Sequence, residues 1–217
     1  MPGAALVIMA RYPIAGEVKT RLARAIGAEA ACGLYRAFLR DLDARFAGGA
    51  RTLVWAYHPP EQNFAALLAA GARCLAQRGE DLGARMYDCF RTLFSEGFAP
   101  VIMIGADVPH VREAWLDEAQ AALADNDLVL GPSIDGGYYL IAMRAPHDVF
   151  DGIVMGTPRV LTDTLRRAHA AGLRVHRLPP TFDVDTAADL QQLRTLLHAA
   201  EYREQLPHTA AVLDRLP

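Results

Sequence analysis

One N-terminal segment, residues 10–23 (ARYPIAGEVKTRLA), combines basic side chains with glycine, as phosphate-binding loops do. Its candidate phosphate ligands are Arg11, Gly16, Lys19 and Arg21. Basic side chains and the backbone N–H groups of a helix N-terminus together bind polyphosphates. The spacing is not that of a P-loop, because that motif needs Gly directly before Lys and Val18 stands there. The segment is therefore either a phosphate-binding loop of another kind or an ordinary strand-to-helix loop with exposed cations.

Lysine usage draws attention to one residue of this segment. The chain has 22 Lys and Arg residues, and Lys19 is the only lysine among them. A chain that otherwise uses arginine for positive charge makes its one lysine a residue to examine.

Three aspartates stand where they could bind a divalent cation. Asp107 lies in the segment GADVPH, directly after an apolar run, and Asp183 and Asp185 alternate in FDVDTAADL. On an extended backbone, alternate side chains face the same side. Mg²⁺ is often bound by one or two carboxylates together with substrate phosphates. The alternative for each aspartate is a helix cap or an Asx turn.

Two further loops hold candidate binding residues. In residues 76–86 (AQRGEDLGARM), Gln77, Gly83 and Arg85 could contact a nucleotide, although a helix start capped by Asp81 is the simpler interpretation. The stretch GPSIDGGYYLIAM holds Asp135-Gly136-Gly137 between two apolar runs, which is typical of a hairpin turn. We expect this turn to form a wall of the site, with Asp135 as a pocket residue.

Alternating patterns predict the elements that must position these loops. Apolar, strand-like runs are found at 4–10, 51–57, 73–77, 100–105, 127–131, 137–143 and 173–178. Helical patterns are found at 19–26, 28–46, 60–71, 81–97, 112–125, 158–172 and 185–202.

This alternation predicts a three-layer α/β/α sandwich with a mixed, mostly parallel sheet. The two adjacent strands at 127–143 break the alternation, so we expect an antiparallel pair there. No linker or repeat interrupts the pattern, and we expect residues 1–217 to form a single domain. In open α/β sheets, ligands bind beyond the carboxyl ends of the strands, where the loops described above begin.

Composition excludes several functions. The formal charge is −3 without a basic block, which does not favour nucleic-acid binding. No apolar run is long enough to span a bilayer, and no signal sequence is evident, so we expect a cytoplasmic protein. Three widely spaced cysteines indicate neither disulfides nor a zinc site. The weakly helical tail after Tyr202 could pack on the domain or on a second subunit, which would give a homodimer.

Five of these stretches occur together, in the same order, in one known family. ARYPIAGEVKTRLA, DLGARM, IGADVP, LGPSIDGGYYLIAM and FDVDTAADL resemble the bacterial rSAM/selenodomain-associated glycosyltransferases. That family belongs to the nucleotide-diphospho-sugar transferases with the GT-A fold. A more distant resemblance links the chain to the molybdenum-cofactor and 2-phospholactate guanylyltransferases. The likeness covers residues from about 5 to 195.

The resemblance implies a role for each loop. Arg11, Gly16, Lys19 and Arg21 would hold nucleotide phosphates, and Gln77, Gly83 and Arg85 would approach the rest of the nucleotide. Asp107, Asp183 and Asp185 would bind Mg²⁺ or Mn²⁺, with Lys19 and Asp107 as catalytic residues. Asp135, Gly136, Gly137 and Thr157 would line the pocket of the second substrate. Relatives carry a Trp-Ser-Thr-like stretch where this chain has Met155-Gly156-Thr157, so we expect either a different acceptor or a weakened activity.

The implied partners are a nucleotide or nucleotide-sugar and a small-molecule acceptor. The family favours glycosyl transfer to that acceptor. Nucleotidyl transfer from a nucleoside triphosphate, with release of pyrophosphate, is the alternative. A nucleotide-binding module without turnover is a third interpretation.

Overall fold

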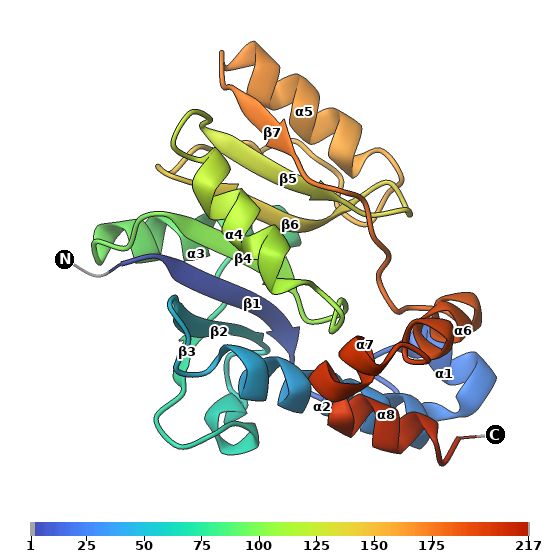
Figure 1. Cartoon of the computed structure of the whole chain (residues 1–217). Helices are drawn as coiled ribbons and strands as arrows, with labels where there is room; N and C mark the ends of the chain where they lie inside the picture. The colour runs from blue at the N-terminus through green and yellow to red at the C-terminus, as the bar shows by residue number, and fades with distance from the viewer. Residues whose placement is uncertain (1–2, 217) are drawn as a thin grey trace.

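A computed structural model describes residues 3–216 and shows an α/β sandwich around a seven-stranded sheet (Figure 1). The strands are β1 (Ala5–Arg11), β2 (Thr52–His58), β3 (Arg73–Ala76), β4 (Val101–Gly105), β5 (Leu128–Pro132), β6 (Tyr138–Met143) and β7 (Val175–Arg177). Their order across the sheet is β3-β2-β1-β4-β6-β5-β7. Only β6 runs against its neighbours, pairing antiparallel with β4 and β5. The predicted mixed, mostly parallel sheet is confirmed.

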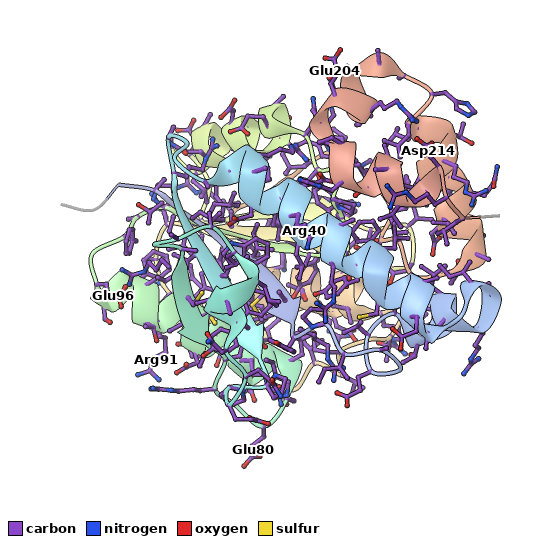
Figure 2. The ribbon with its side chains drawn as sticks, turned by 90° about the horizontal axis from the view of Figure 1, so that it is seen from below. Arg40, Glu80, Arg91, Glu96, Glu204 and Asp214 are labelled. Carbon is purple, nitrogen blue, oxygen red and sulfur yellow. The ribbon has the colours of Figure 1, made fainter. Side chains whose placement is uncertain are left out.

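Helices cover both faces of this sheet. They are α1 (Thr20–Ile26), α2 (Ala28–Phe46), α3 (Leu82–Ser95), α4 (Glu113–Ala122), α5 (Val160–Ala170), α6 (Ala187–Leu196), α7 (Ala200–Gln205) and α8 (Pro207–Leu213). Buried residues of α2, α4, α6 and α8 pack on one face, and those of α3 and α5 pack on the other. Figure 2 shows α2, with Arg40 labelled on it, lying across the lower side of the molecule next to the C-terminal helices.

The central strands show why the sheet is buried on both sides. In β1, Leu6, Ile8 and Ala10 face the layer of α2, while Ala5 and Val7 face the layer of α3. Successive side chains of a strand point to opposite faces, so an unbroken apolar run supplies both cores. Because β1 and β4 pair in parallel, their carboxyl ends lie side by side, with their loops on one edge of the sheet.

Two predicted helices differ in the structure. The stretch 60–71 forms only a 3-10 turn, Phe64–Leu67, because Phe64 is drawn into the core against Trp55 and Tyr57. The predicted helix 185–202 is divided into α6 and α7, with an extended residue, Ala199, between them.

The tail after Tyr202 packs on the domain itself. Buried Asp41 of α2 accepts hydrogen bonds from the backbone N–H groups of His208 and Thr209 at the start of α8, at 2.9 and 2.8 Å. Leu206 and Leu213 are buried in the same core. Within residues 3–216, no helix is long and apolar enough to cross a bilayer.

Candidate active site

A cavity of about 600 Å³ lies at the carboxyl ends of the central strands and gathers most of the predicted residues. Arg11 at the end of β1 and Gly105 at the end of β4 both line it. The predicted site residues in its wall are Arg11, Lys19, Arg21, Gln77, Arg85, Asp107, Asp135, Gly137, Thr157, Asp183 and Asp185. Segments more than 160 residues apart in the chain therefore meet at one site.

Lys19 occupies an unusual backbone position in this cavity. It stands at the N-cap of α1 with φ 51° and ψ 40°, and it is the one non-glycine residue with positive φ among residues 3–216. This left-handed conformation costs about 1–2 kcal/mol for an L-residue. Strain of this kind persists where the surrounding structure fixes it, often at functional sites.

The side chain of Lys19 is held between two carboxylates. Its Nζ donates a hydrogen bond to Asp185 Oδ1 at 2.9 Å and pairs with Asp107 Oδ1. The rings of Tyr35 and Phe38 lie 5.6 and 5.9 Å from Nζ. The Lys19 side chain is 3% exposed, whereas those of Asp107 and Asp185 are 45% and 36% exposed. The ammonium is thus fixed under two carboxylates that face the cavity.

Electrostatics keep Lys19 charged. Burial lowers the pKa of Lys19, but the charges and hydrogen bonds of Asp107 and Asp185 outweigh it and leave this pKa above its usual value. One ammonium between two carboxylates leaves the cluster with a net negative charge. A polyphosphate would be repelled by that charge unless a cation entered with it.

Asp183 lies in a different environment from its neighbour Asp185. Ser133 Oγ donates a hydrogen bond to Asp183 Oδ2 at 2.5 Å. Burial raises the pKa of Asp183 to about 7, and the charges of Asp107, Asp135 and Asp185 act in the same direction. These four carboxylates are therefore close enough to interact.

Asp107 and Asp185 fit a divalent cation better than a three-aspartate set does. Within the described residues, no three His, Cys, Asp or Glu side chains lie close enough together to hold a metal ion. Asp107 and Asp185 each engage Lys19 through Oδ1, and no hydrogen bond to either Oδ2 is found in residues 3–216. Two carboxylates completed by phosphate oxygens are a common arrangement for Mg²⁺.

Gln77 and Arg85 border the other end of the cavity. The buried amide of Gln77 donates to the carbonyls of Ala56 and Ala10, at 2.7 and 3.3 Å, which ties it to the ends of β2 and β1. Its Oε1 is then the amide atom left to accept a bond from a ligand. Arg85 Nε donates to the Gly79 carbonyl at 3.0 Å, and Asp81 caps α3 through Ala84 N–H.

Three predicted glycines lie outside the cavity wall. Gly16 forms a turn with φ 83°, and Gly83 borders a second, smaller cavity on the other side of the start of α3. Gly136 packs against the backbone of Pro158, where a Cβ would lie 2.2 Å from the carbonyl oxygen. This glycine shapes the wall rather than touching a ligand.

The predicted turn at Asp135 is present and borders the cavity. Asp135 Oδ1 accepts a hydrogen bond from Gly137 N–H at 3.0 Å, and Gly136 N–H donates to the Ser133 carbonyl at 3.1 Å. Asp135, Gly137 and the preserved Thr157 line the cavity. The segment is therefore both a turn and part of the pocket.

Sequence reasoning missed several residues that hold the site together. The Tyr35 hydroxyl accepts a hydrogen bond from Arg11 N–H at 3.0 Å. The Ser133 hydroxyl donates to Asp183, and His110 Nε2 lies 3.0 Å from Thr181 Oγ1. Tyr35 lies within an ordinary helix pattern and Ser133 in the turn segment after β5, so no local signal marks their contacts. The position of His110, three residues after Asp107, is a visible signal in the sequence, but its contact with Thr181 is not.

Comparison with known proteins identifies the family. Residues 41–157, more than half of the chain, match the family described as "uncharacterized protein conserved in bacteria" (DUF2064). The chain belongs to this family. A protein from Desulfovibrio desulfuricans G20, described as a nucleotide-diphospho-sugar transferase, has a crystal structure that superimposes with a TM-score of 0.89 at 32% identity. That match covers 99% of this chain and 98% of the other, so the two share the whole fold.

Two further proteins match over less of the chain. The 3-phospho-D-glycerate guanylyltransferase of Phenylobacterium zucineum (strain HLK1) is 33% identical over 133 residues. The match spans 58% of this chain and 61% of that protein's length. A CMP:2-keto-3-deoxy-manno-octonic acid synthetase complexed with CTP superimposes with a TM-score of 0.56 at 16% identity, covering 90% of this chain and 98% of the other. This DUF2064 protein thus has the nucleotide-diphospho-sugar transferase fold.

Proposed function

We propose that this DUF2064 protein is a metal-dependent transferase that uses an activated nucleotide, and that it transfers a nucleotidyl group. The observation that carries the proposal is the buried Lys19 ammonium between Asp107 and Asp185, at the floor of the cavity between β1 and β4. A fixed cation beside carboxylates that face the solvent can meet both parts of a metal–triphosphate complex.

The choice of nucleotidyl over glycosyl transfer rests on the relatives and on the charges. One relative is a guanylyltransferase, and a fold neighbour was crystallised with CTP. Arg11 and Arg21 line the same cavity, and neither forms a salt bridge with any described residue, so both are available to a triphosphate. Glycosyl transfer, which the family resemblance favoured, remains the second candidate because one relative is described as a sugar transferase.

The donor would lie along the edge of the sheet. Its phosphates would face Arg11, Lys19 and Arg21, while its base would approach Gln77 and Arg85. The strand order places β3, which precedes Gln77, two strands from β1. Neighbouring strands are about 4.8 Å apart, so this span suits the length of a nucleotide.

Asp107 and Asp185 would hold Mg²⁺ or Mn²⁺ through their cavity-facing oxygens. When bound, such an ion neutralises charge on the phosphate oxygens. Lys19 would contribute a second, permanent positive charge, since its pKa is raised and it stays protonated. Asp183, with its pKa near 7, would be a weaker ligand than its neighbour.

The proposed reaction is an in-line displacement at the α-phosphorus. An oxygen of the acceptor forms a bond to that phosphorus, and the bond from phosphorus to the β-bridging oxygen breaks. Pyrophosphate leaves with the electron pair of that bond. Lys19, Arg11 and Arg21 would stabilise the charge that develops on the phosphates.

Product analysis separates the candidates. The protein is incubated with Mg²⁺ and each nucleoside triphosphate plus phosphorylated acceptors, 3-phosphoglycerate among them, or with nucleotide-sugars plus sugar and alcohol acceptors. Phosphorus NMR then identifies the released group. Nucleotidyl transfer gives pyrophosphate, and glycosyl transfer gives a nucleoside diphosphate.

The variant Asp107→Asn tests the metal assignment, because it keeps the shape of the side chain but removes its charge. We expect it to lower turnover by about a hundredfold or more, as loss of a preorganised electrostatic group does. Unchanged metal-dependent turnover in this variant would refute the metal assignment. Nucleotide binding without turnover of any donor would favour the third candidate, a binding module.

A further inference from the structure

The cavity is chemically divided. Its cationic side chains are Arg11, Lys19, Arg21 and Arg85, with His58 beside them at the end of β2. The wall toward β6 also carries six apolar side chains, interspersed with the uncharged polar side chains of Tyr138 and Thr157; they are Leu82, Met86, Met103, Ile141, Met155 and Val160. A nucleotide accounts for the first part and leaves the second without a ligand.

The apolar part has a fixed place in the fold. Met103 of β4 and Ile141 of β6 are directly paired, and both point into the core layer under α3. Met86 of α3, and Met155 of the loop between β6 and α5, pack against the same layer. A Cβ at Gly83 would lie 3.2 Å from Met155 Cε, so this loop lies against the start of α3. The apolar wall therefore runs from β4 toward β6, away from β2 and β3.

No cation lines this side of the cavity in the described chain. From β6 and the loop at 155–160, the residues that reach the cavity are apolar or uncharged, and the adjoining turn contributes Asp135. Arg85 is the nearest cation on α3, but its Nε is bound to the Gly79 carbonyl on the side of Gln77. A phosphate or carboxylate here would meet no positive charge and would lie close to Asp135.

Exposed apolar side chains near the cavity also favour an apolar ligand. Three large apolar side chains stand out as exposed in residues 3–216: Leu82 at 45%, Ile134 at 70% and Val154 at 71%. Leu82 lines the cavity, and each of the others directly precedes a cavity residue, Asp135 or Met155. Leu82 is therefore an exposed apolar side chain in the cavity wall itself, as is typical of ligand contact.

We propose that the acceptor carries an uncharged, apolar body that fills this part of the cavity, instead of a second phosphate or carboxylate. That this ligand is the acceptor of a transfer reaction rests on the proposed function. That the subsite binds an apolar group rests on the residues of the cavity wall alone. Methionines suit such a ligand because their flexible side chains adapt to irregular apolar shapes. The body would extend from the acceptor's reacting group, near Asp107, toward Met155 and Val160.

Alkyl phosphates test this directly. Binding of ethyl, butyl and hexyl phosphate, and of 3-phosphoglycerate as a polar comparison, is measured by titration calorimetry with the protein alone. The phosphate group can reach the cations while the chain samples the apolar wall. We expect affinity to rise roughly threefold for each added methylene, as burial of apolar surface predicts. Hexyl phosphate should bind at least tenfold more tightly than 3-phosphoglycerate.

The variant Met155→Gln keeps the length of the side chain and adds polarity at a half-buried position, and urea denaturation checks that it folds. Its matched control is Ile153→Gln on the same loop, outside the cavity wall. Met155→Gln should weaken hexyl phosphate about fivefold without changing ethyl phosphate, and Ile153→Gln should change neither. Affinity that is independent of chain length, or tighter binding of 3-phosphoglycerate, would overturn the proposal. A separate nucleotide titration shows whether the proposed function itself fails.

Discussion

At the scale of single residues, Lys19 is the feature on which the site depends. A buried ammonium is costly unless it is paired, and here Asp107 and Asp185 both pair with it. The same carboxylates remain partly exposed and face the cavity. One residue thereby orients two others, and its left-handed backbone sets the start of α1.

Replacing Lys19 with Met should separate catalysis from stability. The variant keeps the buried stem against Tyr35 and Phe38, while the two aspartates can be solvated at the cavity surface. We expect turnover to fall by about 10²–10³-fold. The free energy of unfolding should fall by no more than about 2 kcal/mol, because the two aspartates left unpaired are partly exposed, whereas loss of one partner from a fully buried pair costs about 3–5 kcal/mol.

Urea denaturation and steady-state kinetics measure these two quantities. Arg24→Met, an exposed cation on the same helix, is the control and should change neither. A Lys19→Met protein that retains full turnover would contradict the role given to this residue.

At the scale of elements, the loops that carry the carboxylates are fastened to each other. Val184 N–H donates to the Asp107 carbonyl at 2.9 Å, and His110 Nε2 lies 3.0 Å from Thr181 Oγ1. The ring of His110 also stacks on Phe182, with centroids 4.3 Å apart. His110 is thus a positioning residue that holds the segment of Asp183 and Asp185 against that of Asp107.

This contact should make stability depend on pH. Burial lowers the pKa of His110 from 6.5 to about 4, and the charge of Arg45 adds to the effect. Between pH 6.5 and pH 4, His110 is protonated in the unfolded chain but neutral in the folded chain. Its contribution to the free energy of unfolding is therefore fully present above pH 6.5 and is lost as the pH falls toward 4. The loss amounts to at most about 3 kcal/mol.

Denaturation at pH 7.5 and pH 5 tests the contribution of His110. His110→Gln should remove part of the difference between the two pH values, whereas His169→Gln, an exposed histidine on α5, should leave it unchanged. Equal pH dependence in the wild type and in His110→Gln would show that His110 is not responsible.

The turn at Gly136 is the other element that shapes the site. Gly136 has φ 93°, and a Cβ there would lie 2.2 Å from the Pro158 carbonyl oxygen. Gly136→Ala should therefore cost more than about 2 kcal/mol, because backbone strain and a collision with backbone add together. Gly172 has φ 70° and open space around it, so Gly172→Ala should cost only about 1 kcal/mol. Similar losses in urea denaturation of both variants would contradict the close approach.

At the scale of the whole molecule, the fold followed from the sequence because its strands are plainly apolar. The runs around Val7, Ile102 and Leu140 are buried on both faces, and the interruption at 127–143 correctly predicted the antiparallel pair. The division between α6 and α7 was not predicted, because no Gly or Pro marks residues 197–199. Tertiary packing decides it, since Leu197 and Leu206 must both enter the core.

The site was only partly predictable, because its contacts also depend on tertiary packing. Loops after strands pointed to Lys19, Asp107 and Asp185, and composition singled out Lys19. The pairing of Lys19 with both aspartates could not be predicted from the sequence, because Asp107 and Asp185 are 88 and 166 positions away from it. The separate environment of Asp183 could not be predicted either, because it depends on a hydrogen bond from Ser133 and on burial.

The central claim is that a nucleotide binds in the cavity over Lys19 with a divalent cation. Thermal unfolding with each nucleoside triphosphate and nucleotide-sugar, with and without Mg²⁺ or Mn²⁺, tests it most directly. At a hundredfold excess over Kd, a true ligand stabilises the folded protein by about 2.7 kcal/mol, or several degrees in Tm. We predict such a shift for at least one triphosphate, dependent on the metal and lost in Asp107→Asn. The absence of any shift across the panel would contradict the account.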